Sequence, residues 1–512
     1  MATLFFMGAW LFVFPFFERL KNPNENVRFY MTAALVEQGS YEISEARSRW
    51  GWVNDAACVE RGDDGAVPCE GALRGERSYY SVKAPLTSWL GVPGYLIARA
   101  IRGGTPELSF GLWWARLLGT AIPCAIFVFF FYRFLGGLTR SPQARDFAFI
   151  AFTFGSVFLG YSYIFASHAT SAAFAGGAFM LLAWFRRRGP AADWRDSLRG
   201  WALTALAGFL AAGVTALEYP CFFFSVFLCL YALFNVRPWP RLLAFGLGSL
   251  VPTLLVAHFQ YSAFDNPLSP GHLFVENPAF RSIHDEGFFG ADRFRTEAAY
   301  ALLFSWREGL FTFTPAFVFA FAGLPILLRR ERRGTIVAFS ATMISYLAVC
   351  FLRNWDGGWV IGPRYLVVVL PFMAMATAVG YEWALLRARP LAAFGVGLLC
   401  LSVLVSGMVG IYYPHVPPEI RYPLPHLVWP LMQDGRAPHT ALDWIGITGP
   451  YALLPLAALV LAMLAWMVGR WRLRIWLSGA VLCAAVATGL FFRPEEPVSE
   501  TALQHIKNSW EP

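Results

Sequence analysis

Charged residues are scarce in this 512-residue chain, and lysine is the scarcest of them. Charged residues make up 14% of the sequence, whereas 57% of the residues are hydrophobic and 17% are aromatic. Soluble domains carry about 25% charged residues, so the composition excludes a disordered chain, a coiled coil and a typical cytosolic enzyme. It indicates a protein whose main solvent is lipid.

Several motifs of soluble enzymes are also missing. Neither G-x-x-x-x-G-K-[ST] nor G-x-G-x-x-G occurs, which argues against ATP as a direct substrate. The sequence contains no G-x-S-x-G and no H-E-x-x-H. No group of acids, histidines and cysteines has the spacing of metal ligands, so no metal site is predicted.

Apolar segments dominate what is present. A helix needs about 20 apolar residues to cross a membrane. Segment 84–101 is apolar but is interrupted by prolines and glycines, so we expect it to be an interfacial helix. The sequence predicts an all-α integral membrane protein with about thirteen transmembrane helices, at 2–17, 110–132, 147–165, 169–185, 200–217, 220–235, 242–260, 311–328, 335–352, 365–386, 391–412, 448–468 and 475–492.

Arginine clusters orient these spans. They lie in short loops between apolar runs, for example at 186–188 and 329–333, and this placement does not suit a nucleic-acid partner. Basic residues are enriched in cytoplasmic loops. We therefore expect a multi-pass protein of the inner (plasma) membrane with a cytoplasmic N-terminus. The long polar loops would then be extracytoplasmic, chiefly 18–109, 261–310, 353–364 and 413–447.

Two cysteines share the first of these outer loops. Cys58 and Cys69 lie in polar sequence, whereas the other six cysteines lie in apolar segments. An extracytoplasmic loop permits a disulfide. The sequence alone leaves open whether the two thiols are paired, because pairing depends on geometry.

The first candidate site follows the first span, in the segment from Asn22 to Tyr30. Glu25 is an acid held close to the bilayer, and partial desolvation would raise its pKa toward the range of a general base. Asn24 and Arg28 flank it. The alternative is a surface ion pair between Glu25 and Arg28 at i,i+3, and spacing alone favours this alternative.

The second candidate site precedes the interfacial helix. Lys83 lies in the segment from Tyr79 to Leu86, which also contains the cavity candidate Tyr80, and is the only lysine between residues 22 and 506. A compact ammonium at headgroup level suits a phosphate. The alternative is snorkelling toward anionic lipid.

The remaining candidates lie at the ends of later spans. The segment 354–365 contains Gly358, where backbone can approach a ligand, and Arg364, which could bind phosphate. Its aromatic residues are either a membrane-interface belt or faces for a sugar. Burying a carboxylate beside apolar helix ends is energetically costly, which makes Glu218 a candidate. His168 is a weaker candidate, because a lone histidine at a helix end is more often a capping residue or part of the interface belt. The cavity candidates from these segments are Trp355, Gly358, Tyr365, His168 and Glu218.

Together these segments resemble the multispanning GT-C glycosyltransferases that use polyprenyl-phosphate-linked sugars. Within that class, the group of protein O-mannosyltransferases and lipid A aminoarabinose transferases is the most similar. The resemblance extends from the start of the chain to about residue 385. It is carried by a retained first span and by Pro23-Asn24-Glu25, Tyr80 to Leu86, Arg116 and Gly357-Gly358 to Tyr365.

The resemblance implies a GT-C fold with juxtamembrane helices in a large first outer loop. Residues 1–412 would form the catalytic core, and 413–512 would add an outer loop, two spans and an outer tail. Glu25 matches the acid that the family uses near the acceptor, and Lys83 matches the residue that contacts the lipid phosphate. Val82 departs from the family, in which an acid is frequent at this position. The resemblance therefore leaves open whether a divalent metal takes part and which sugar is transferred.

The implied reaction is an inverting displacement at the anomeric carbon. The lipid phosphate is the leaving group, and Lys83 and Arg364 stabilise its charge. Glu25 takes a proton from the acceptor hydroxyl. The partners would be a polyprenyl-phosphate-linked sugar, an envelope glycan, lipid or protein acceptor, and membrane lipids.

Two other functions are considered. A lipid or lipid-linked-sugar transporter (a flippase) places ionisable groups at the membrane midplane, whereas Arg116 and Glu218 lie near span ends, which favours an enzyme. An O-antigen-ligase-like or polymerase-like enzyme would use the same class of donor with a different acceptor.

Overall fold

The structure is a computed structural model. It describes residues 22–62, 65–69, 76–187, 194–285, 287, 290–455 and 497–509, with a few separate positions between 457 and 489. The expected spans 2–17 and 475–492, and the later part of 448–468, lie wholly or largely outside the described residues.

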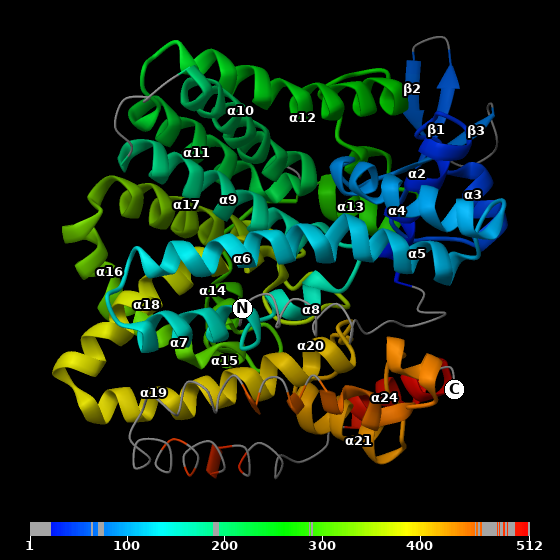
Figure 1. Ribbon diagram of the computed structural model, residues 1–512. Helices are drawn as coiled ribbons and strands as arrows, with labels where there is room; N and C mark the ends of the chain where they lie inside the picture. Colours follow the sequence, from blue (N-terminus) through cyan, green and yellow to red (C-terminus); the bar gives the residue numbers. More distant parts are fainter. Residues whose placement is uncertain are drawn as a thin grey trace.

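The described chain is mostly helical (Figure 1). The α-helices are α2 (Pro23–Glu37), α3 (Ser44–Trp50), α4 (Leu86–Arg102), α5 (Leu108–Arg116), α6 (Ile122–Gly136), α7 (Pro142–Thr153), α8 (Phe158–Ser162), α9 (Ser167–Arg187), α10 (Trp194–Leu217), α11 (Phe222–Asn235), α12 (Arg241–Phe264), α13 (Pro278–Asp285), α14 (Thr296–Phe304), α15 (Leu310–Phe313), α16 (Phe319–Arg330), α17 (Arg332–Phe351), α18 (Leu370–Arg387), α19 (Arg389–Ser402), α20 (Met408–Tyr412), α21 (Trp429–Gln433) and α24 (Pro497–Ser509). Shorter 3-10 or π turns are η1 (Leu117–Ala121), η2 (Tyr219–Cys221), η3 (Gly271–Phe274), η4 (Pro315–Val318), η5 (Arg364–Val369), η6 (Val403–Gly407), η7 (Leu424–Val428), η8 (Ala441–Ile445) and η9 (Gly449–Leu453).

Seven helices within the described residues are long and apolar enough to cross a membrane. Each coincides with a span expected from the sequence, and α5, η1 and α6 join into one of them. The expected total of about thirteen spans is not reached in the part of the chain that the structure describes. The seven are Leu108–Gly136, Ser167–Arg186, Asp196–Leu217, Arg241–Phe264, Arg332–Phe351, Arg364–Arg387 and Arg389–Tyr412.

Two expected spans are broken, which corrects the sequence-based prediction. Segment 147–165 divides into α7 and α8, and the Ser156 hydroxyl bonds to the carbonyl of Phe152 at the break, competing with the helical ladder. Segment 311–328 divides at Pro315, which has no N–H to donate. Segment 220–235 forms a single helix, α11, of 14 residues, shorter than a full span.

A small antiparallel sheet lies between α3 and α4 and corrects the all-α prediction. Strands β1 (Ala56–Gly62), β2 (Gly65–Pro68) and β3 (Arg77–Ser81) have the order β2-β1-β3. A disulfide between Cys58 and Cys69, with their Cα atoms 5.5 Å apart, joins β1 to the end of β2. The sheet brings the start of β1 next to the end of β3, where Ala56 pairs with Ser81.

Helix α4 has the two faces expected of the predicted interfacial helix. Gly91, Gly94 and Tyr95 are buried, whereas Leu96 and Ile101 are exposed to solvent or lipid. A Cβ on Gly94 would lie 2.3 Å from the carbonyl oxygen of Trp114, so glycine lets α4 pack closely on α5.

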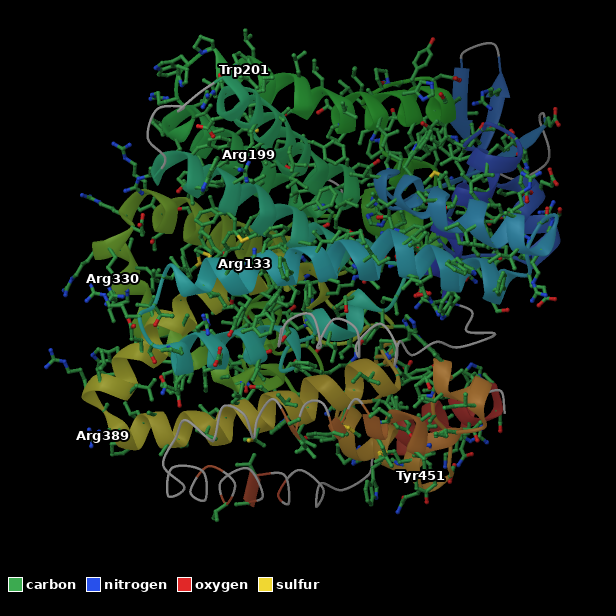
Figure 2. All side chains as sticks on the ribbon, viewed as in Figure 1. Arg133, Arg199, Trp201, Arg330, Arg389 and Tyr451 are labelled. Carbon is green, nitrogen blue, oxygen red and sulfur yellow. A yellow bond between two sulfur atoms is a disulfide. The ribbon has the colours of Figure 1, made fainter. Side chains whose placement is uncertain are left out.

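The two sets of loops lie at opposite ends of the helices. In Figure 1 the sheet, α2 to α5 and α24 lie at one end, and the turns between α6 and α7, α16 and α17, and α18 and α19 lie at the other. Figure 2 places Arg330 and Arg389 at this second end. These two arginines therefore lie at the end of the helices away from the sheet.

Candidate functional site

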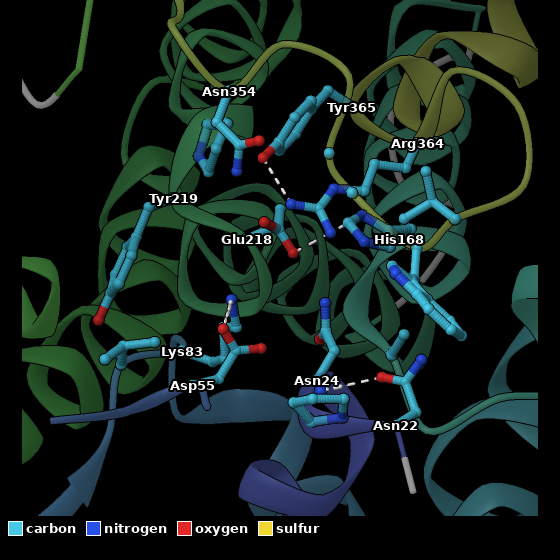
Figure 3. Close-up of a pocket in the computed structure, with 18 of the residues that line it drawn as sticks. Asn22, Asn24, Asp55, Lys83, His168, Glu218, Tyr219, Asn354, Arg364 and Tyr365 are labelled. Carbon is cyan, nitrogen blue, oxygen red and sulfur yellow. Dashed lines mark hydrogen bonds and ion pairs between the residues drawn. The ribbon is translucent and has the colours of Figure 1, made fainter. Parts of the chain in front are cut away.

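A cavity of about 1480 Å³ lies at the end of the helices that carries the sheet (Figure 3). Its wall draws on α2, the turn before β1, the link from β3 to α4, the ends of α9 to α11, the segment 352–365, and α24. Segments more than 400 residues apart thus share one wall. Among the residues that the sequence predicts for the site, nine line this cavity: Asn24, Glu25, Arg28, Lys83, His168, Glu218, Gly358, Arg364 and Tyr365.

Two predicted site residues are not in the cavity wall. The Tyr80 hydroxyl accepts a hydrogen bond from Arg61 at 3.1 Å, and its ring packs edge-on against Phe264. Trp355 packs against the main hydrophobic core. Neither ring lines the cavity, because Tyr80 packs against Phe264 and Trp355 packs against the core.

The sheet positions an ion pair that the sequence did not reveal. Lys83 Nζ lies 3.3 Å from Asp55 Oδ1. The Val82 N–H donates to the Asp55 carbonyl at 3.2 Å, and the Lys83 N–H donates to the Ser81 hydroxyl at 3.0 Å. Asp55 precedes β1 and Lys83 follows β3, so strand pairing determines that the two side chains meet.

The charges around Asp55 and Lys83 act on both groups. Burial alone would raise the pKa of Asp55, but Lys83 and Arg364 lower it below its usual value. Burial lowers the pKa of Lys83, and Asp55 opposes this shift. Asp55 therefore stays ionised at neutral pH inside a largely buried pair.

A second ion pair joins α2 to the end of α10. Arg28 Nη2 lies 3.5 Å from Glu218 Oε2 and donates to the Ser167 hydroxyl at 2.9 Å. The Ser167 hydroxyl in turn donates to Glu218, and His168 Nδ1 lies 3.7 Å from the same carboxylate. Although burial alone would raise it, the pKa of Glu218 is lowered to about 2 by His168 and Arg28.

Arg364 adds a third cation to the cavity. Its Nη2 donates to the hydroxyl of Tyr365 at 2.6 Å. Gly357 has φ +74°, and a Cβ at this position would lie 2.5 Å from Arg364 Nε, so glycine makes room for the guanidinium. Within the described chain, three buried ring or guanidinium nitrogens facing this cluster have no hydrogen-bond partner, namely Nε of Arg28, Nε of Arg364 and Nε2 of His168.

Glu25 is fully buried and engaged by the protein. Its Oε2 accepts from Arg116 Nε at 3.0 Å and from Nη2 of the same guanidinium. Its Oε1 accepts the backbone N–H of Phe165 at 3.0 Å. Glu25 thus ties α2 to α5 and to the turn before α9, while Arg28 extends to Glu218.

Histidines line much of the remaining wall. The rings of His272 and His284 stack with centroids 4.7 Å apart. Burial lowers the pKa of His272 to about 3, so its imidazole is neutral at physiological pH. Across the described residues, no three or more histidines, cysteines or acids come together as a group that could hold a metal ion.

No protein-family model matches the chain, and no curated protein matches it. Solved structures are similar at low sequence identity. ArnT from Cupriavidus metallidurans is similar both bound to undecaprenyl phosphate (15% identity, TM-score 0.47, 99% of this chain and 77% of that chain) and in the apo state (15%, 0.46, 94% and 75%). The oligosaccharyltransferase of Archaeoglobus fulgidus, in complex with Zn and sulfate, is similar at 12% identity, TM-score 0.46, over 82% of this chain and 54% of that chain. Because these TM-scores are below 0.5, no conclusion about the function or about the residues of the site follows from the similarity.

Proposed function

We propose that this chain is an integral membrane glycosyltransferase. It would move a sugar from a polyprenyl-phosphate donor to an acceptor at the extracytoplasmic face. The observation that carries the proposal is the cluster of Arg28, Lys83 and Arg364 with two carboxylates in one cavity. The three basic side chains of this cluster outnumber its two carboxylates, Asp55 and Glu218, and this arrangement suits a bound phosphate.

The donor phosphate would lie among the three cations. Arg28 Nε and Arg364 Nε are buried donors without partners in the described chain, and Lys83 has only a carboxylate to exchange for a phosphate oxygen. Guanidinium groups bind phosphate oxygens through directed hydrogen bonds, and an ammonium adds a compact charge. These groups would stabilise the charge that develops on the leaving phosphate.

The prenyl chain has an apolar path out of the cavity. The wall beside Tyr219 continues into Phe222 and Phe223 at the start of α11 and into Val349 and Phe351 at the end of α17. Phe222 is 53% exposed and Phe351 is 40% exposed, which is costly in water and favourable in lipid. Their position supports a donor whose headgroup lies in the cavity and whose chain lies in the bilayer.

Asp55, rather than Glu25, would accept the proton of the acceptor. Both carboxylate oxygens of Glu25 are held by Arg116 and Phe165, whereas Asp55 meets Lys83 and is partly open to the cavity. In the reaction, the acceptor oxygen bonds to the anomeric carbon, and the bond from that carbon to the phosphate oxygen breaks. The phosphate leaves with the electron pair, and the acceptor proton goes to Asp55.

Two measurements test this proposal, transfer of the sugar and binding of polyprenyl phosphate, each with a matched control variant. Purified protein in nanodiscs is given radiolabelled polyprenyl-phosphate sugars, and release of polyprenyl phosphate is measured. Lys83→Met should weaken binding of polyprenyl phosphate by about 10- to 100-fold, the worth of a hydrogen bond to a charged group. Arg389→Met should leave this binding unchanged, since Arg389 lies at the opposite end of the helices and is not in the wall.

The outcome separates the enzyme from the transporter. Release of polyprenyl phosphate that depends on Lys83 supports the transferase. If no polyprenyl phosphate is released across a broad donor panel and the lipid-linked sugar moves between leaflets instead, the transferase proposal is wrong and the protein is a flippase.

A further inference from the structure

The part of the cavity wall that is formed by Trp359 and by residues between 413 and 509 is here called the second compartment. Figure 3 places Tyr219 on one side of the cavity and Asn22 on the other, with Asp55, Lys83 and Glu218 between them. Asn22 contacts His415, with Asn22 Nδ2 2.5 Å from His415 Nδ1. The side opposite the apolar path therefore leads to the C-terminal part of the described chain.

This second compartment differs in charge from the cluster. Its wall is formed by Trp359 and by residues between 413 and 509, and none of these described lining residues is an acid, an arginine or a lysine. Burial, with the nearby charge of Arg116, lowers the pKa of His415 to about 3, so this ring is uncharged at neutral pH. The polar side chains of the wall are Trp359, Tyr413, His415, His439, His505 and Ser509.

The compartment is held in shape by contacts behind its wall. Lys507 Nζ lies 2.8 Å from Asp434 Oδ2, and Arg436 donates to the Lys507 carbonyl at 2.7 Å, which fixes the end of α24. The Val360 N–H donates to the Val416 carbonyl at 3.0 Å and holds the loop that carries Trp359. The charged side chains of this region thus serve the scaffold, and neutral groups face the cavity.

Trp359 and two histidines give this wall a recognition surface. Trp359 is 45% exposed, and its ring meets His505 edge-on at 6.4 Å. His415 Nε2 is buried and has no hydrogen-bond partner in the described chain. An apolar ring face beside a few fixed hydrogen-bonding groups is the usual construction of a small-molecule site.

We propose that this compartment is the acceptor subsite and that it takes an uncharged carbohydrate. The inference rests on the proposed transferase function and adds the chemical class of its acceptor. One sugar ring would stack on Trp359, and hydroxyls would bond to His415 and His505. A phosphorylated or carboxylated acceptor would find no arginine or lysine in this wall to balance its charge.

Direct binding tests this inference without turnover. The full-length protein in nanodiscs is titrated with mannotriose, maltotriose and triacetylchitotriose as neutral probes, and with trigalacturonate as an anionic probe of similar size. Binding is followed by saturation-transfer NMR. At least one neutral trisaccharide should bind, and Trp359→Ala should weaken it about tenfold or more, as truncation of an aromatic anchor does.

Two further variants separate stacking from general damage. Trp359→Phe keeps an aromatic face and should lose less affinity than Trp359→Ala. Trp239→Ala, at an exposed tryptophan outside the cavity wall, should not change binding. The inference is overturned if no neutral trisaccharide binds, if Trp359→Ala binds as the wild type does, or if trigalacturonate binds more tightly through Trp359.

Polyprenyl phosphate is titrated into the same preparations. If it binds in a Lys83-dependent manner and no neutral trisaccharide binds, the acceptor inference fails and the transferase proposal stands. If polyprenyl phosphate does not bind, the proposed function itself fails.

Discussion

Two carboxylates of the first outer segment each meet a basic side chain, but in different surroundings. Glu25 is fully buried, and Arg116 and the Phe165 N–H occupy both of its oxygens. Asp55 meets Lys83 at 3.3 Å in the wall of the cavity. A carboxylate whose two oxygens are both held by buried donors holds structure together, whereas one with a single, exchangeable partner can take part in chemistry.

The two pairs also differ in what positions them. Glu25 is 91 residues from Arg116 and lies on α2, so helix packing brings the pair together. Asp55 precedes β1 and Lys83 follows β3, so both lie at the same end of this strand pair, where Ala56 is opposite Ser81. Removing one carboxylate should therefore change the stability of the fold, and removing the other should change the reaction.

The largest expected effect is on the rate of transfer. Asp55→Asn should lower the rate by about 10²- to 10⁴-fold, because a general base contributes on this scale. Its unfolding temperature should fall less than that of Glu25→Gln, because Asp55 and Lys83 are more exposed than Glu25 and Arg116. The measurement is single-turnover transfer at saturating donor, beside thermal unfolding of the same preparation.

Retention of the full transfer rate by Asp55→Asn would remove Asp55 from the reaction. Glu218 would then be the remaining acid of the cluster, and Glu218→Gln would be tested in the same assay.

The next effect is on stability. Glu25→Gln leaves the buried guanidinium of Arg116 without a charged partner, and breaking a buried ion pair costs about 3–5 kcal/mol. The expected result is a large loss of unfolding free energy in denaturant. In the double variant with Arg116→Met, part of this stability should return, because no charge is left buried.

An exposed pair provides the control for Glu25. Glu45 pairs with Arg49 at 2.6 Å on the surface, where such a pair contributes about 0–1 kcal/mol. Equal losses for Glu25→Gln and Glu45→Gln would contradict the structural role of Glu25. Normal stability of Glu25→Gln with lost transfer would restore Glu25 as the base.

The contrast between the two pairs also shows what the sequence could predict. Seven spans and the grouping of Arg28, Lys83, Glu218 and Arg364 follow from apolar length and from polar residues at span ends. Asp55 could not be found in this way, since it lies in a loop with no motif and only strand pairing brings it to Lys83. The role of Glu25 was equally hidden, because its partner is distant in the sequence.

The smallest effect concerns a third pair, Arg28 and Glu218, which is buried like the first and faces the cavity like the second. The pKa of Glu218 is lowered from 4.5 to about 2. A carboxyl whose folded-state pKa is lowered stabilises the fold fully above its unfolded pKa, and this contribution is lost as the pH falls toward the folded pKa. Glu218→Gln should therefore be less stable than the wild type at neutral pH, and the difference should shrink as the pH is lowered from about 5 to about 3.

Thermal unfolding of both proteins across this pH range measures the shrinking difference. Glu45→Gln serves again as the control, since its side chain is exposed and its difference from the wild type should be small throughout. A difference for Glu218→Gln that stays constant with pH would mean that the Glu218 carboxyl titrates alike in the folded and unfolded chain. Arg28 would then gain nothing from that carboxylate and would be available to a phosphate.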